Sequence, residues 1–189
     1  LFPRGAADPK LLSLLKVPLY PYQAEGALFA VHAGRALIGD DMGLGKTIQV
    51  IDLILQLEAA RKALPATKNR RVNSGDGAAP FLLIVPASLI GNWKQELDRF
   101  APQLKVFLAH RSECDAATLD KVAKKPATEL AGYDVVVTTY TLIRRSTWPA
   151  DVYWRMVVLD EAQAIKNSGS AQSKSVRKLK ASGRIALTG

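Results

Sequence analysis

The sequence predicts an α/β fold, with a mostly parallel central sheet and helices on both faces of that sheet. Short apolar runs such as residues 81–85 (Phe-Leu-Leu-Ile-Val) are typical of strands that are buried on both sides. These runs alternate with stretches whose apolar residues recur at helical spacing, as in the βαβ units of parallel sheets. The length of 189 residues suits one such lobe, and no internal repeat is visible.

The expected elements follow from these patterns in chain order. Strands are expected at residues 35–39, 81–85, 105–108, 134–138, 156–159 and 184–187. Helices are expected at residues 22–33, 47–60, 89–100, 116–124, 140–145 and 170–179. Gly34 is expected to end the first of these helices, and Ser88 to cap the start of the third. The aromatic residues between 148 and 154 are expected in a packed loop.

We divide the chain into a short N-terminal segment, residues 1–18, and one α/β lobe, residues 19–189. Within the lobe, residues 61–80 are rich in Lys, Arg, Gly and Asn and show no apolar period. This composition predicts a mobile basic insertion on the surface.

The charge of the chain favours a polyanionic partner, because 26 Lys and Arg oppose 17 Asp and Glu. A basic surface that only keeps the protein soluble is the alternative, and charge does not separate the two. The single cysteine, Cys114, excludes an internal disulfide and a cysteine-cluster metal site. No apolar run approaches ~18 residues and no secretory leader is visible, so we expect no membrane span and no secretion. The expected location is the cytoplasm or nucleoid, or the nucleus.

Residues 39–47 (Gly-Asp-Asp-Met-Gly-Leu-Gly-Lys-Thr) lie between an expected strand and an expected helix, the context of a phosphate-binding P-loop. Gly43 and Gly45 let the backbone turn so that several N–H groups point at one anion. Lys46 is then placed to reach the β- and γ-phosphates, and Thr47 to bind Mg²⁺. The strict pattern has a glycine at the position of Asp40, so a glycine-rich turn after a strand is the alternative.

An acidic pair, Asp160 and Glu161, follows the apolar run at residues 156–159. In parallel sheets, ligands bind beyond the carboxyl ends of the strands, so this pair is expected near the phosphate loop. Asp160 would hold Mg²⁺, and Glu161 would orient the attacking water or accept its proton. Acidic residues that merely favour a helix N-terminus are the alternative.

Six motifs in order resemble the first RecA-like lobe of superfamily two helicase motors, and more narrowly the Swi/Snf family of chromatin remodellers and DNA translocases. They occupy residues 19–23, 39–49, 85–89 with 92–93, 137–140, 160–167 and 187–189. The resemblance implies a RecA-like P-loop NTPase lobe that binds ATP and Mg²⁺ and contacts the backbone of double-stranded DNA. In that family Asp40 is ordinary at the first glycine position.

The resemblance also implies roles for individual residues, with Gln23 reading the adenine. The implied nucleotide-binding residues are Gln23, Asp41, Met42, Gly43, Leu44, Gly45, Lys46 and Thr47. The implied catalytic residues are Lys46, Asp160, Glu161 and Gln163, with Thr47 and Asp160 as the metal ligands. The implied DNA-contacting residues are Ser88, Thr138 and Thr139.

The sequence departs from the family pattern in three ways. Gln163 stands where many relatives have His, but either residue can bond the γ-phosphate or the region of Thr188, so activity is still expected. The insertion at residues 61–80 is long. The second RecA-like lobe is absent, and in this family it supplies the arginines that complete the ATP site; an arginine finger contributes ~10³–10⁵ in rate. The isolated chain is therefore expected to bind nucleotide weakly and to hydrolyse it hardly at all.

Three functions remain open from the sequence. The first is half of an ATP-driven motor on double-stranded DNA, with affinity for DNA that falls steeply with salt. The second is a nucleotide-gated module that binds a protein or nucleic acid without motor activity. The third is an RNA helicase. The sequence favours it least, because the acidic motif and residues 92–93 resemble the DNA-translocating family instead.

Overall fold

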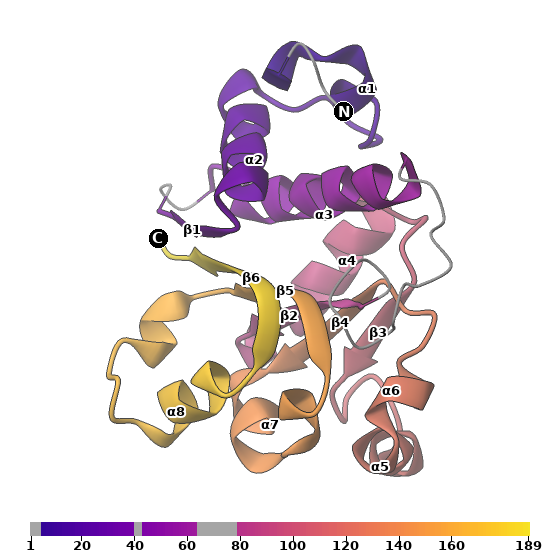
Figure 1. The fold of residues 1–189 in the computed structure, drawn as a ribbon, viewed down its shortest axis with the longest axis vertical. Coiled ribbons are helices and arrows are strands. Elements are labelled where there is room, and N and C mark those ends of the chain that lie inside the picture. The colour runs from indigo at the N-terminus through magenta and orange to yellow at the C-terminus, as the bar shows by residue number, and fades with distance from the viewer. Residues whose placement is uncertain (1–4, 40–42, 64–78) are drawn as a thin grey trace.

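The computed structural model describes residues 5–39, 43–63 and 79–189, and in them a six-stranded sheet forms the centre of the protein (Figure 1). Its strands are β1 (Arg35–Ile38), β2 (Phe81–Val85), β3 (Val106–Ala109), β4 (Val135–Thr139), β5 (Tyr153–Leu159) and β6 (Lys180–Leu187). All the strand pairs described are parallel, in the order β1-β6-β5-β2-β4-β3. The α/β prediction is confirmed, and the described sheet is wholly parallel.

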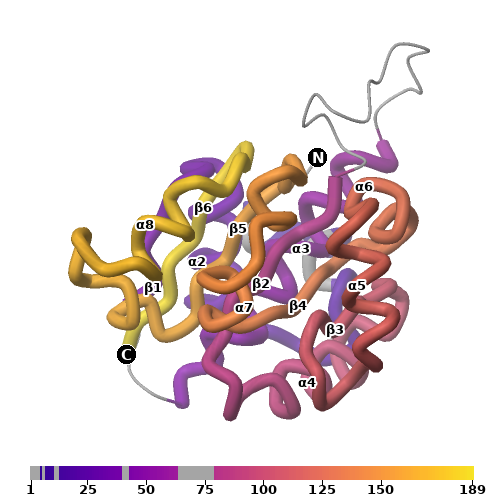
Figure 2. The backbone as a smooth tube through the Cα atoms, turned by 90° about the horizontal axis from the view of Figure 1, so that it is seen from below, coloured from indigo at the N-terminus to yellow at the C-terminus, as the bar shows by residue number. Residues whose placement is uncertain are grey.

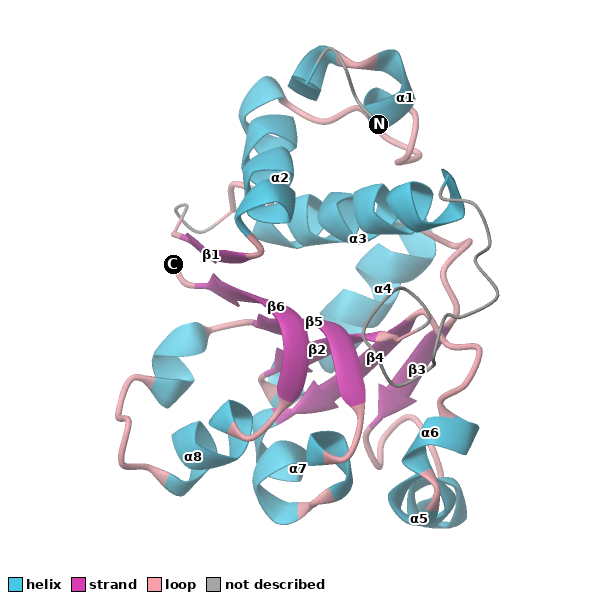
Figure 3. Ribbon diagram, viewed as in Figure 1, coloured by secondary structure: helices cyan, strands magenta, loops and turns pink. Residues whose placement is uncertain are grey.

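Helices cover both faces of the sheet, as the alternation of patterns predicted (Figure 3). The α-helices are α1 (Pro9–Leu12), α2 (Pro21–Ala33), α3 (Lys46–Ala63), α4 (Ile90–Phe100), α5 (Ala116–Lys124), α6 (Pro126–Glu129), α7 (Tyr140–Arg145) and α8 (Ala171–Arg177). Short 3₁₀ helices are η1 (Gly5–Ala7), η2 (Ala87–Leu89), η3 (Trp148–Ala150) and η4 (Ala162–Ile165). Helices α2, α3 and α4 lie on one face, and α5, α7 and α8 on the other (Figures 1 and 2).

Alternate residues of the central strands face two separate apolar cores. On β2, Phe81, Leu83 and Val85 belong to the core under α2, α3 and α4. Leu82 and Ile84 belong to the core under α5, α7 and α8. All five residues are buried, which explains why this strand appears in the sequence as a continuous apolar run instead of an alternating one.

One of the two sequence-based predictions about helix ends is confirmed, because Gly34, with φ 65°, ends α2. At the start of α7, the Thr139 hydroxyl accepts a hydrogen bond from the Leu142 amide. The prediction that Ser88 caps the next helix is wrong. Ser88 lies inside η2, because the chain closes a tight turn from Pro86 immediately after β2, and α4 begins only at Ile90 without a side-chain cap.

Strand β5 begins at Tyr153, so the stretch predicted as a loop up to residue 154 is partly strand. The charged Arg155 interrupts the apolar run and hid this part of the strand. The structure accommodates it because its guanidinium donates to Glu58 Oε1 at 2.5 Å and stacks over the Phe81 ring. Trp154 is fully buried, and its indole N–H donates to the Pro149 carbonyl at 2.8 Å.

The ends of the lobe add three observations. Leu15, from the N-terminal segment, is buried in the same core as α2 and α3. Helix α3 continues to Ala63, and most of the expected insertion at 61–80 lies outside the described residues. No helix in the described part of the chain has the length and apolar character needed to cross a membrane.

Candidate active site at the strand ends

The sheet directs three of the predicted motifs to a single edge. Strands β1, β6 and β5 are parallel neighbours, and β6 pairs through Leu187 with Ile38 and through Ala186 with Leu159. The phosphate loop follows β1, the acidic pair follows β5, and Thr188 follows β6 in the chain. The Thr188 amide also donates to the Ile38 carbonyl at 3.1 Å, which joins the end of β6 to the start of the loop.

The described part of the phosphate loop has a backbone that requires glycine. Gly43 and Gly45 have φ values of 86° and 76°, which L side chains rarely adopt. A Cβ atom at Gly45 would also lie 2.5 Å from the amide nitrogen of Gln23. Helix α3 begins at Lys46, so its N-terminal amides lie at the end of the loop, where a helix can bind an anion. Asp41 and Met42, predicted in the same site, lie outside the described residues.

Gln23 lies beside this loop, in the first turn of α2. Its side chain is buried, and its amide N–H donates to the Leu44 carbonyl at 3.1 Å. The Tyr22 hydroxyl donates to the same carbonyl, also at 3.1 Å. The Gln23 amide oxygen accepts from the Tyr20 backbone N–H. These bonds place Gln23 on the wall of the candidate nucleotide site, and its predicted contact with adenine stays a prediction.

Lys46 and Asp160 come together from distant parts of the chain. Burial raises the pKa of the Asp160 carboxyl, and this effect outweighs hydrogen bonds and the nearby Lys46 charge, which lower it. A buried carboxylate of this kind favours a cation beside it. Each of its oxygens accepts one hydrogen bond and keeps a lone pair, and Thr47 supplies a hydroxyl in the first turn of α3. Oxygen ligands of this type fit Mg²⁺.

Glu161 has a strained backbone. With φ 49° and ψ 54°, it is the one non-glycine residue of the described chain in the left-handed region. Such a conformation costs roughly 1–3 kcal/mol and often occurs at functional sites. The Gln163 side-chain amide donates to the Glu161 carboxylate, and the Thr188 hydroxyl donates to the Gln163 oxygen at 3.2 Å. Gln163 thus links the acidic pair to the end of β6.

Two residues that support Asp160 were not among the predicted site residues. The Trp93 indole N–H donates to Asp160 Oδ2 at 2.8 Å, and the Tyr140 hydroxyl donates to the Asp160 carbonyl at 2.7 Å. Both residues lie within motifs that carry the family resemblance. Sequence spacing alone could not show that these segments meet at one carboxylate.

The predicted DNA-contacting residues differ in exposure. Ser88 is exposed on η2. Thr138 is fully buried and donates its hydroxyl to the Ala109 carbonyl at 3.1 Å. Thr139 is also buried, and its hydroxyl accepts from the Leu142 amide at 3.2 Å. Donation from the Thr138 hydroxyl to DNA would require its bond to Ala109 to break, whereas the Thr139 hydroxyl, which only accepts, keeps its own O–H as a donor.

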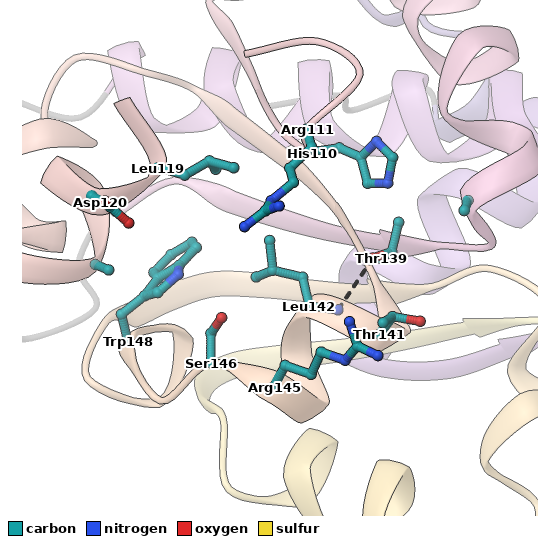
Figure 4. A pocket seen from close by; sticks show the side chains of 12 residues that line it. His110, Arg111, Leu119, Asp120, Thr139, Thr141, Leu142, Arg145, Ser146 and Trp148 are labelled. Atoms are coloured by element: carbon teal, nitrogen blue, oxygen red, sulfur yellow. Dashed lines mark hydrogen bonds between the residues drawn. The ribbon is translucent and has the colours of Figure 1, made fainter. Parts of the chain in front are cut away.

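A pocket of about 580 Å³ lies beside Thr139, at the ends of β2, β3 and β4 (Figure 4). Arg111, Arg145 and Thr141 line it, and Figure 4 shows the Arg111 guanidinium directed into the pocket. Within the described residues, neither arginine has a carboxylate at salt-bridge distance, although Asp120 lies on another wall. The sheet edge therefore has a nucleotide half, at β1, β6 and β5, and a basic half, at β2, β4 and β3.

Comparison with known proteins agrees with this geometry. A family model described as SNF2-related domain matches residues 22–189. The chain is 38% identical over 190 residues to Bacillus subtilis YwqA, named as an ATP-dependent helicase/translocase, and covers 18% of that protein. It is 38% identical over 184 residues to the chromatin-remodeling ATPase INO80 of Cryptococcus neoformans and covers 10% of it. These alignments cover 96% and 93% of the present chain.

A solved structure shows the same fold. The Sulfolobus solfataricus SWI2/SNF2 ATPase core in complex with dsDNA matches with a TM-score of 0.75 and 33% sequence identity. The match covers 94% of the present chain and 33% of the Sulfolobus chain. The protein therefore spans only a minor part of the length of these relatives. The family model and the shared fold together show that this chain belongs to the SNF2-related domain family, as a first ATPase lobe.

Proposed function

We propose that this chain is the ATP-binding half of an ATP-dependent motor that moves along double-stranded DNA or remodels its complexes. The observation that carries the proposal is the convergence of Lys46, Asp160 and Glu161 at one sheet edge, with a basic pocket further along that edge. The names of the relatives, a helicase/translocase and a chromatin-remodelling ATPase, support the same activity.

Each group at the nucleotide half has a defined task in this proposal. The loop amides and Lys46 bind the phosphates, and Thr47 and Asp160 hold Mg²⁺. The metal, when bound, neutralises charge on the phosphates. Glu161 orients the attacking water or accepts its proton, and its strained backbone fixes its position. Gln163 joins Glu161 to Thr188, so the acidic pair responds to the end of β6.

We propose that a second RecA-like lobe is the partner of this one. The relatives are several times longer than the present chain, which leaves room for such a lobe. It would supply arginines to the nucleotide, which typically raise the hydrolysis rate ~10³–10⁵-fold. The 189-residue chain alone should accordingly bind nucleotide weakly and show almost no turnover.

DNA would bind along the basic half of the edge, through its phosphate backbone and without sequence preference. Ser88 is exposed there, and the guanidinium groups of Arg111 and Arg145, which form no salt bridge within the described part of the chain, are suited to phosphate oxygens. Because Thr138 and Thr139 are buried, these exposed groups are the better candidates for direct contacts.

Two substitutions test the nucleotide site by isothermal titration of the chain with ATP and Mg²⁺. Lys46→Ala should abolish nucleotide binding, whereas Glu161→Gln should retain it and, in a motor that has both lobes, stop turnover. Wild-type affinity in Lys46→Ala would refute the proposed phosphate site. Equal loss of binding in both variants would show that Glu161 binds nucleotide and does not act on the water.

A further inference from the structure

Trp93 connects α4 to the acidic pair through one partly buried hydrogen bond. Its side chain is only 2% exposed and packs in the core under α2, α3 and α4. Its indole N–H donates to Asp160 Oδ2 at 2.8 Å, across 67 positions of the sequence. A buried indole N–H without a partner is costly, so this bond couples the positions of the two residues.

Two donors on different elements orient the Asp160 carboxylate. The Glu161 backbone amide donates to Oδ1 at 3.0 Å, and Trp93 donates to Oδ2. Because each oxygen has its own donor, the carboxylate cannot rotate without breaking at least one of these bonds. The remaining lone pairs on the two oxygens are thereby held in fixed directions.

We infer that Trp93 is a positioning residue, which orients Asp160 for the divalent metal of the bound nucleotide. This inference rests on the proposed function, because it assumes that Asp160 is a metal ligand. Hydrogen-bond partners of metal ligands typically change metal affinity or activity 10–100-fold when they are removed. Trp93 acts through its bond to Asp160, so its removal should affect metal-dependent binding and leave metal-free binding unchanged.

Trp93→Phe and Trp154→Phe form a matched pair of variants. Both tryptophans are buried, and each donates one indole hydrogen bond of 2.8 Å. The Trp154 bond reaches the Pro149 carbonyl in the other core, away from the acidic pair. Replacement of Trp93 by 3-benzothienylalanine removes the N–H and preserves the ring shape, and this variant decides the question if Trp93→Phe does not fold.

The measurement uses the 189-residue chain with a non-hydrolysable ATP analogue. Binding of Mn²⁺ in the presence of the analogue is followed by electron paramagnetic resonance, and analogue affinity is measured with Mg²⁺ and with EDTA. Trp93→Phe should weaken Mn²⁺ binding about 10-fold and leave affinity in EDTA unchanged. Trp154→Phe should match the wild type in both measurements.

Three outcomes would overturn the inference. Unchanged Mn²⁺ binding in the folded Trp93 variants would show that the indole does not orient Asp160. Equal effects of Trp93→Phe and Trp154→Phe would show a general loss of packing. If the wild-type chain binds no nucleotide with or without Mg²⁺, the proposed function fails first, and the inference fails with it.

Discussion

Replacement of Asp52 by Asn should stabilise the protein more at pH 8 than at pH 4.5. Asp52 lies in α3 and is fully buried, and burial raises its pKa to about 6, against a lowering by the hydrogen bond from Gln56. The Gln56 amide N–H donates to Asp52 Oδ2 at 2.7 Å. Asp52 Oδ1 and Gln56 Oε1 have no partner among the described residues. A proton on Asp52 Oδ1, or the amide hydrogens of Asn, would replace one of these two acceptors by a donor, which the Gln56 oxygen can accept.

The sign and size follow from the two pKa values. The folded value of about 6 lies above the model value of 3.8, so the folded state binds more protons between these pH values. The free energy of unfolding therefore falls as pH rises through this window, by about 3 kcal/mol in total at 1.36 kcal/mol per pKa unit. Between pH 4.5 and pH 8, about 2 kcal/mol of this loss should occur. The Asn variant lacks this loss because it does not ionise.

Urea unfolding followed by circular dichroism at both pH values measures this difference. The change in unfolding free energy from wild type to Asp52→Asn should be about 2 kcal/mol more favourable at pH 8 than at pH 4.5. Asp98→Asn makes the same chemical change on the exposed surface of α4 and should alter stability by less than about 0.5 kcal/mol. An Asp52→Asn effect that is the same at both pH values would refute the assignment of a buried, proton-binding carboxyl.

Three further predictions concern other parts of the fold. Glu58→Ala leaves the nearly buried Arg155 without its carboxylate and should lower the unfolding free energy by about 3 kcal/mol, as measured by urea unfolding; a loss under 1 kcal/mol would contradict it. Gly45→Ala forces a side chain into a left-handed backbone at a cost of about 1 kcal/mol or more, so it should weaken ATP binding. An unchanged Kd for ATP in isothermal titration would contradict the proposal that this loop binds the phosphates. Arg145→Ala should reduce the slope of log affinity for duplex DNA against log salt concentration by about one unit, as measured by fluorescence anisotropy. Arg144→Ala, which changes a residue outside the pocket lining, should leave this slope unchanged. Equal slopes for the two variants would show that the pocket does not bind DNA.

The sequence predicted the correct bounds of those elements whose burial and end signals lie in adjacent residues. Residues 81–85 match β2 at both ends, because every side chain of that strand enters a core and the flanking prolines limit it. Residues 116–124 match α5 at both ends, where Asp115 caps the helix by accepting from the Thr118 amide. The common edge of the phosphate loop and the acidic pair also followed from the sequence, since parallel strands all end on one side.

Prediction from the sequence failed where the role of a residue depends on a partner that is distant in the chain. Arg155 lies outside the strand predicted at residues 156–159, yet it belongs to β5, where Glu58 neutralises it across 97 positions. Thr138 looks like an exposed hydroxyl at a strand end, but the neighbouring strand β3 offers it the Ala109 carbonyl. Local spacing cannot reveal such pairs, since they depend on strand order and on which helix covers which face.

Asp160 is where the two halves of the sheet edge meet. Its carboxylate accepts from Trp93, one turn into α4, and its carbonyl accepts from Tyr140, the first residue of α7. Both helices begin at the basic half of the edge, after β2 and β4, and a helical turn transmits a displacement with little deformation. A ligand that shifts either helix start would therefore move a donor of Asp160. By thermodynamic reciprocity, a metal that fixes Asp160 would favour one position of those helix starts, so DNA and nucleotide would bind with coupled affinities.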